Sequence, residues 1–84
     1  MNNVIMFSVV LSAEYRPLAE RPLVATVDVS APPGNTGPVF FLGLEGAEVR
    51  WVAGEWHSLV RVDLSTIRVK GTPGDVVTVI GGTW

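Results

Sequence analysis

The sequence contains no cysteine and a single histidine, His57. Without cysteine the chain has no disulfide to staple its fold and no thiolate to bind zinc or attack a substrate. One histidine cannot build a metal site by itself, and Asp28, Asp63 and Asp75 lack the spacing of a calcium-binding loop. We therefore expect no metal ion and no cofactor.

Charged residues are also scarce, at 17% of 84 residues with a net charge of −2. A nucleic-acid partner requires a basic surface that displaces counterions from phosphates. Six Lys and Arg residues are scattered among eight Asp and Glu residues, so we expect no nucleic-acid partner. Soluble domains usually contain about a quarter charged residues, and we interpret the deficit as surface that other protein covers.

A segment long enough to span a membrane as a helix is missing as well. The apolar run at residues 4–11 is far shorter than the roughly 20 residues that such a helix needs. Ser12 and Ala13 follow this run in the manner of a secretory signal, but no Lys or Arg precedes it. We expect no membrane association, and synthesis and use of the chain from Met1 without export.

Short alternating segments separated by turn residues are abundant. Seven segments have strand character, at residues 4–12, 23–30, 39–43, 47–52, 58–63, 66–70 and 75–80. Short strands at spacings of about ten residues predict an all-β domain, a small β-sandwich or jelly roll of about seven antiparallel strands. A partly open β-barrel is the alternative. We expect one domain over residues 1–84, with an N-terminal strand or arm at 1–12, loops at 13–22 and 31–37, and a C-terminal tail at 81–84.

Several residues in these segments have expected architectural roles. Asp63 and Ser65 are placed to accept backbone N–H bonds at the corner between two strands. Gly71 and Gly74 are expected to supply positive φ angles around a proline-containing turn, and Asp75 to cap the strand that follows. Along the strand at 58–63 and just after it, we expect Val60, Val62 and Leu64 on one face, opposite Leu59, Arg61 and Asp63.

Three tryptophans occupy different contexts. Trp51 is in phase with Val49 and is expected in the core. Trp56 and His57 follow a turn, so we predict a ligand or partner contact there, either stacked on a sugar ring or packed under a neighbouring loop or subunit. Trp84 follows two glycines, and we predict that it either anchors in a pocket of another subunit or folds back on its own domain.

The first strand segment is apolar on both faces, so a free copy would be an aggregation-prone edge. We expect it to be buried between layers or paired with another chain. The predicted interface residues are Val4, Ile5, Phe7, Val9, Leu11 and Trp84. Since a chain of this size buries only about 60% of its unfolded surface, we expect a homo-oligomer, with a trimer favoured, to complete the core.

No segment has the pattern of an active site. Glu45, Glu48 and Glu55 lie near one another, but in turns or outward strand positions, where carboxylates are solvated. A small sandwich also offers little cleft in which to raise a carboxylate pKa for glycosidase chemistry. We expect no enzymatic activity.

Four motifs lie within residues 38–82 or at their border. They are Gly37-Pro38-Val39, Ala53-Gly54-Glu55, DLSTIRVKG at residues 63–71 and GDVVTVIG at residues 74–81. Together they resemble a recurrent module of tailed-bacteriophage structural proteins, including small head-decoration (cement) proteins. The resemblance covers about half of the chain, and Ala53 stands where the module usually has proline. These motifs form turns and strands and carry no catalytic signature.

The resemblance implies a structural protein on the virion surface, made in the host cytoplasm. Its partner would be the major capsid protein, and its role would be to reinforce the phage head. Two alternatives remain at this point. One is a carbohydrate- or host-surface-binding module at the periphery of the virion, and the other is a component of the tail or neck connector.

Overall fold

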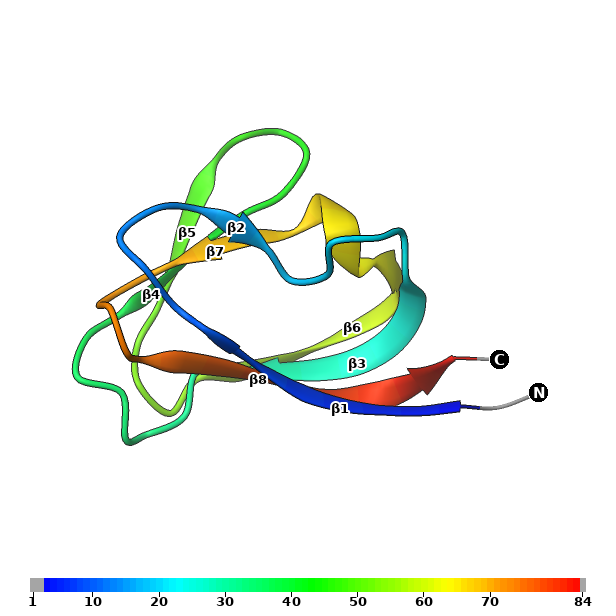
Figure 1. The fold of residues 1–84 in the computed structure, drawn as a ribbon, viewed down its shortest axis with the longest axis horizontal. Helices are drawn as coiled ribbons and strands as arrows, with labels where there is room; N and C mark the ends of the chain where they lie inside the picture. Colours follow the sequence, from blue (N-terminus) through cyan, green and yellow to red (C-terminus); the bar gives the residue numbers. More distant parts are fainter. Residues whose placement is uncertain (1–2, 84) are drawn as a thin grey trace.

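The computed structural model describes residues 3–83 and consists of two four-stranded antiparallel sheets that face each other (Figure 1). Sheet A contains, in order, β1 (Asn3–Val10), β8 (Val76–Thr83), β3 (Val24–Ser30) and β6 (Trp56–Asp63). Sheet B contains β2 (Arg16–Pro17), β7 (Arg68–Lys70), β4 (Val39–Leu42) and β5 (Glu48–Trp51). The predicted all-β sandwich is confirmed, and the sheets do not close into the barrel that was the alternative.

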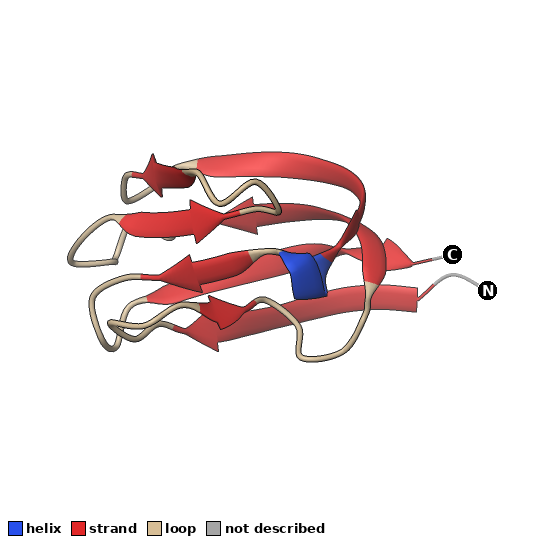
Figure 2. Ribbon diagram, turned by 90° about the horizontal axis from the view of Figure 1, so that it is seen from above, coloured by secondary structure: helices blue, strands red, loops and turns tan. Residues whose placement is uncertain are grey.

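The strand order is that of a jelly roll. The first strand pairs with the eighth, the second with the seventh, the third with the sixth and the fourth with the fifth. This long two-stranded ribbon is rolled up so that β8 also pairs with β3, and β7 with β4. The described ends of β1 and β8 consequently lie side by side at one end of the sandwich (Figure 2).

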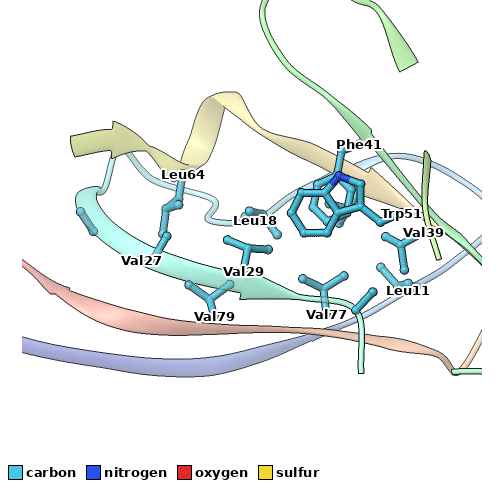
Figure 3. Close-up of a cluster of buried hydrophobic side chains, with 13 residues drawn as sticks. Leu11, Leu18, Val27, Val29, Val39, Phe41, Trp51, Leu64, Val77 and Val79 are labelled. Atoms are coloured by element: carbon cyan, nitrogen blue, oxygen red, sulfur yellow. The ribbon is translucent and has the colours of Figure 1, made fainter. Parts of the chain in front are cut away.

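The core lies between the sheets and is supplied by alternate strand residues. Phe41 and Trp51 stack within it with ring centroids 3.8 Å apart, and Trp51 is buried at 7% exposure, as expected. Leu11, Leu18 and Leu64 enter the core from the connections between strands (Figure 3). The other fully or nearly fully buried core residues are Ala25, Val27, Val29, Ala31, Val39, Val69, Val77 and Val79.

The turn at the end of β6 is held by Asp63, as predicted. Its carboxylate accepts the backbone N–H of Ser65 at 3.0 Å and that of Leu23 at 3.1 Å. The Ser65 hydroxyl donates to the same carboxylate at 2.7 Å and does not act as the expected backbone acceptor. A single 3-10 turn, Leu64–Thr66, follows and places Leu64 in the core.

The two turn glycines before β8 serve different purposes. Gly74 has a φ of 94°, as predicted. The prediction of a positive φ at Gly71 is wrong. Glycine fits there because a Cβ atom would lie 2.8 Å from Leu11 Cδ1 and 3.3 Å from the Pro38 carbonyl oxygen. Close packing, not backbone angle, thus explains this glycine.

Strand β6 contains a bulge that the alternation pattern did not predict. Leu59 pairs with Val27 and Val62 pairs with Ala25, so two residues of β6 stand opposite one residue of β3. One of the two, Arg61, has a φ of 52°. The bulge shifts the alternation, so the expectation that Val60 shares the inner face of Val62 is wrong. Val60 is 67% exposed.

Two regions expected as irregular contain strand structure. Within residues 13–22, Arg16 and Pro17 pair with β7 as the two-residue strand β2. Residues 81–83, expected as a tail, continue β8. Gly81 permits this continuation, because a side chain there would collide with the Thr26 carbonyl and with Val27 on the adjacent strand. Across residues 3–83, no helix has the length and apolar character needed to cross a lipid bilayer.

Candidate protein-binding surface

Strand β1 presents its two sets of side chains to different environments. Ile5, Phe7 and Val9 are half-buried and pack against the core. Val4 and Met6 point the other way and are 75% and 70% exposed. The contact residues predicted on this strand therefore divide between an inner set that supports the sandwich and Val4, which lies on its outer surface.

The remaining two predicted contact residues lie outside β1. Leu11 is a core residue at 2% exposure, and its N–H donates to the Asp75 carbonyl at 2.8 Å. Trp84 lies outside the described residues. Met6 and Val10, exposed on the outer surface of β1, are not among the six predicted interface residues. Only the pairing with β8 identifies them, because residues 4–11 are apolar at nearly every position.

Exposed apolar side chains continue from β1 across the outer face of sheet A. Ile80 of β8 pairs with Met6 and is 54% exposed. On the opposite edge strand, Val60 and Trp56 are also exposed. In the middle of the face, Asp28 accepts a hydrogen bond from the Ser58 hydroxyl at 2.5 Å. Exposed apolar side chains gathered on one face are a feature of protein-interaction surfaces.

The outer face of sheet B has a different chemistry. Glu48 accepts a hydrogen bond from the Tyr15 hydroxyl and lies 3.5 Å from Lys70 Nζ. The same ammonium group lies 4.8 Å from the Tyr15 ring centroid and 5.7 Å from that of Phe40. The side chains of Tyr15, Glu48 and Lys70 are therefore paired with one another within the chain.

This pairing on sheet B perturbs two titrating groups. Burial, together with the hydrogen bond to Glu48 and the charge of Glu48, raises the pKa of Tyr15 to about 12. The hydrogen bond from Tyr15, aided by the nearby Lys70 ammonium, lowers the pKa of Glu48. Neither group faces a cleft, so these shifts reflect mutual stabilisation and do not suggest acid–base catalysis.

Trp56 and His57 lie on opposite sides of sheet A. Trp56 pairs with Ser30 and faces outward, whereas His57 pairs with the buried Val29. The imidazole lies 4.6 Å from the Trp51 ring, between centroids, and its Nε2 is 2.6 Å from a Glu55 carboxylate oxygen. The structure thus does not bring the predicted pair together as one stacking platform.

Asp75 is the buried carboxylate of the described residues. It accepts the backbone N–H groups of Thr36 and Gly37 at 3.0 Å and also the Thr36 hydroxyl. The Thr36 N–H bond contributes most to lowering the pKa of Asp75. The Asn35 side chain adds two bonds to the backbone of Val76, at 2.8 and 3.0 Å. These bonds fix the loop at residues 31–37 and assign Asp75 an architectural role.

Clusters that suggest catalysis or metal binding are absent from residues 3–83. No group of three His, Cys, Asp or Glu residues is placed to hold a metal ion in this range. Every buried side-chain nitrogen or oxygen there has a hydrogen-bond partner. Comparison of the chain with protein-family models, with curated proteins and with solved structures finds no match. The outer face of sheet A is therefore the candidate functional surface.

Proposed function

We propose that the chain is a structural protein of a tailed-bacteriophage particle that binds the outside of the head and reinforces it. The observation that carries this proposal is the apolar outer face of sheet A. Val4, Met6 and Ile80 are each more than half exposed and adjoin one another on paired strands. Covering such a face with another protein stabilises the complex by about 25 cal/mol for each Å² of apolar surface removed from water.

The choice of a phage head comes from the resemblance of residues 38–82, and the architecture supports it. The DLS portion of the motif at residues 63–71 forms the corner between β6 and β7, and the GD portion of the motif at residues 74–81 leads into β8. The motifs thus form turns and strands, which is the role that the resemblance implies for them. The implied partner is the major capsid protein, and the implied location is the virion surface.

The proposed mechanism is non-covalent binding, with no catalysed reaction. A rigid sandwich laid across a junction between capsid subunits adds buried apolar area where subunits otherwise contact only each other. The exposed apolar side chains supply contact area, and the small number of charges on the face limits the free-energy cost of removing it from water. A jelly roll alone does not specify this role, since one fold serves many functions.

The test is the number of copies in purified particles of the virus that encodes the chain. Quantitative mass spectrometry should find it at a level comparable with the major capsid protein. A low copy number matching a single tail would support the connector alternative and contradict decoration. Absence from the particles would contradict every virion role proposed for the chain.

A further inference from the structure

Each sheet has two edge strands, and three of the four are protected against pairing with another chain. Strand β2 is two residues long and contains Pro17, and β5 carries Glu48 and Arg50. Strand β6 is interrupted by the bulge at Arg61. Strand β1 has none of these devices. It runs for eight residues, Asn3–Val10, without a charge, a proline or a bulge.

The backbone of β1 offers hydrogen-bonding groups to this free edge. The Leu11 N–H donates to Asp75 on the β8 side, and the Leu11 carbonyl accepts from Gly74 on the same side. Because the direction of these groups alternates along a strand, the even-numbered residues of β1 direct theirs away from β8. Their side chains are the exposed ones, as the same alternation requires.

The unpaired backbone positions along this edge of β1 are centred on Met6. At one end, the Val10 carbonyl already accepts a hydrogen bond from the Arg16 guanidinium at 3.3 Å. The even-numbered residues before it are Val4, Met6 and Ser8, and no strand among the described residues pairs with them on this side. These three positions are symmetric about Met6.

We infer that β1 pairs antiparallel with β1 of a second copy of this chain, about a two-fold axis at Met6. In this register Met6 exchanges backbone hydrogen bonds with the partner's Met6, and Val4 does so with the partner's Ser8. Between them, Ile5 lies opposite the partner's Phe7 in a pair without hydrogen bonds, where facing side chains come closest. The half-buried inner side chains of β1 would thereby be covered.

The groove beside β1 supports this arrangement. It has a volume of about 330 Å³ and lies between residues 7–10 and the segment that includes Arg16, Leu18 and Glu20. The second strand would end at this groove. Its inner side chains would close the open side of the sandwich, where Phe7 and Val9 are only half-buried. A strand from a second copy therefore completes a core that a single copy leaves partly open.

A second copy is favoured over an unrelated protein because the edge is complementary to itself. No charged side chain lies on β1, so two copies meet without like charges opposite each other. The assembly stops at a dimer, because the pairing uses the β1 edge of both copies and leaves only the bulged β6 edges of sheet A. It joins two copies of sheet A into one eight-stranded sheet, in which the exposed apolar side chains of the two β1 strands adjoin on the outer face. The inference does not depend on what binds that face.

The first test compares two exposed residues on opposite edges of sheet A. Met6 is 70% exposed on β1, and Val60 is 67% exposed on β6. Sedimentation equilibrium of the wild type should give twice the chain mass of 9.0 kDa. Met6→Lys places like charges on the two-fold axis and should give the monomer, whereas Val60→Lys should remain a dimer.

The backbone contribution is tested by Met6→Pro. This substitution removes the N–H that points to the free edge and leaves the bonds to β8 in place. Two symmetric hydrogen bonds are lost, so the dissociation constant should rise by about 30-fold. A wild-type monomer, a wild-type trimer, or loss of the dimer in both Lys variants would overturn the inference. A trimer would leave the proposed function standing.

A cross-linking test covers the case in which a Met6 variant folds poorly. The chain has no cysteine, so single-cysteine variants report one contact each. Paired Cα atoms about 5.5 Å apart at the axis suit a disulfide, and Met6→Cys should form a covalent dimer on oxidation. In the same register the Cα atoms of the two Val4→Cys residues are roughly 14 Å apart, so this variant should not form a covalent dimer. Equal cross-linking of both variants, or of neither, would contradict the register.

Discussion

The two outer faces of the sandwich differ in how their side chains are partnered. On sheet A, Met6 and Ile80 pair across neighbouring strands, yet both remain more than half exposed to water. On sheet B, Tyr15, Glu48 and Lys70 contact one another through a hydrogen bond, an ion pair and a cation–π contact. Both faces cover the same core. The comparison teaches that the sandwich pairs a polar cluster internally on one face and leaves apolar side chains exposed on the other.

The edges of sheet A repeat this difference. Strand β6 ends the sheet with a bulge, whereas β1 is regular and uncharged along its length. A protein that must remain monomeric protects both edges. The open edge and the apolar side chains of the outer face meet at β1. This strand therefore takes part in both the proposed pairing with a second copy and the proposed contact with the capsid.

The largest expected effect is on stability, and it concerns the loop that connects the two sheets. Asp75 fixes the loop that leads from β3 in sheet A to β4 in sheet B. Asp75→Ala leaves the Thr36 and Gly37 N–H groups without their acceptor, and should lower the Tm by roughly 10 °C. Calorimetry at neutral pH measures this change. An unchanged Tm would show that the loop does not need the carboxylate.

The pH dependence of stability offers a second measurement on Asp75. Hydrogen bonds lower the pKa of this carboxyl in the folded chain. Its contribution is therefore fully present above the ordinary Asp pKa of about 3.9, and is lost as the pH falls through the folded value. Asp75→Asn should reduce, without abolishing, the loss of stability on acidification, because Asp63 and Glu55 also have lowered pKa values. An unaltered acid slope would contradict the assignment.

The next effect concerns binding alone. Ile80 on the outer face of sheet A is 54% exposed, and Val49 on the edge strand β5 of sheet B is 53% exposed. Val49 pairs with the buried Phe41 and therefore lies away from the outer face of sheet A. Ile80→Lys should weaken binding to phage heads that lack the chain by at least about tenfold, because it places a charge in the apolar contact. Val49→Lys is the matched control and should bind normally. Co-sedimentation measures both, and equal binding of the two variants would contradict a binding role for the outer face of sheet A.

The local parts of this structure were predictable from the sequence. Asp63 forms its turn through residues two positions away, and Gly74 adopts its positive φ within a short proline-containing turn. The alternation in β3 is also local, and it puts the buried Val27 and Val29 on one face. In each case the determining contacts lie close in the sequence or follow from strand periodicity.

The non-local parts were not predictable. The bulge at Arg61 arises where β6 meets Thr26, whose hydroxyl accepts the Arg61 N–H at 3.1 Å. Strand β2 exists because β7 passes beside Arg16 and Pro17. The candidate surface depends on such contacts as well, since the inner and outer residues of β1 are equally apolar. Only the register with β8 distinguishes Met6 from Phe7.

A smaller effect is expected on sheet B. Tyr15 is the single tyrosine of the chain, so the absorbance of phenolate reports on it alone. Burial and Glu48 raise its pKa to about 12, which means that its contribution to stability is present below about pH 10 and lost as the pH rises toward 12. Glu48→Gln should move the titration midpoint downward, with circular dichroism confirming the fold. A midpoint near 10 in the wild type would contradict the hydrogen bond.

The smallest effect is expected from Lys70. Its ammonium group lies 3.5 Å from Glu48 and 4.8 Å from the Tyr15 ring centroid, at the surface. Exposed ion pairs contribute little, because solvent screens them and two long side chains must be held in place. Lys70→Ala should lower the Tm by no more than a few degrees, and less at high salt. Since Lys70 is paired within the chain, the variant should bind heads as the wild type does. A binding defect larger than that of Ile80→Lys would reverse the roles of the two faces.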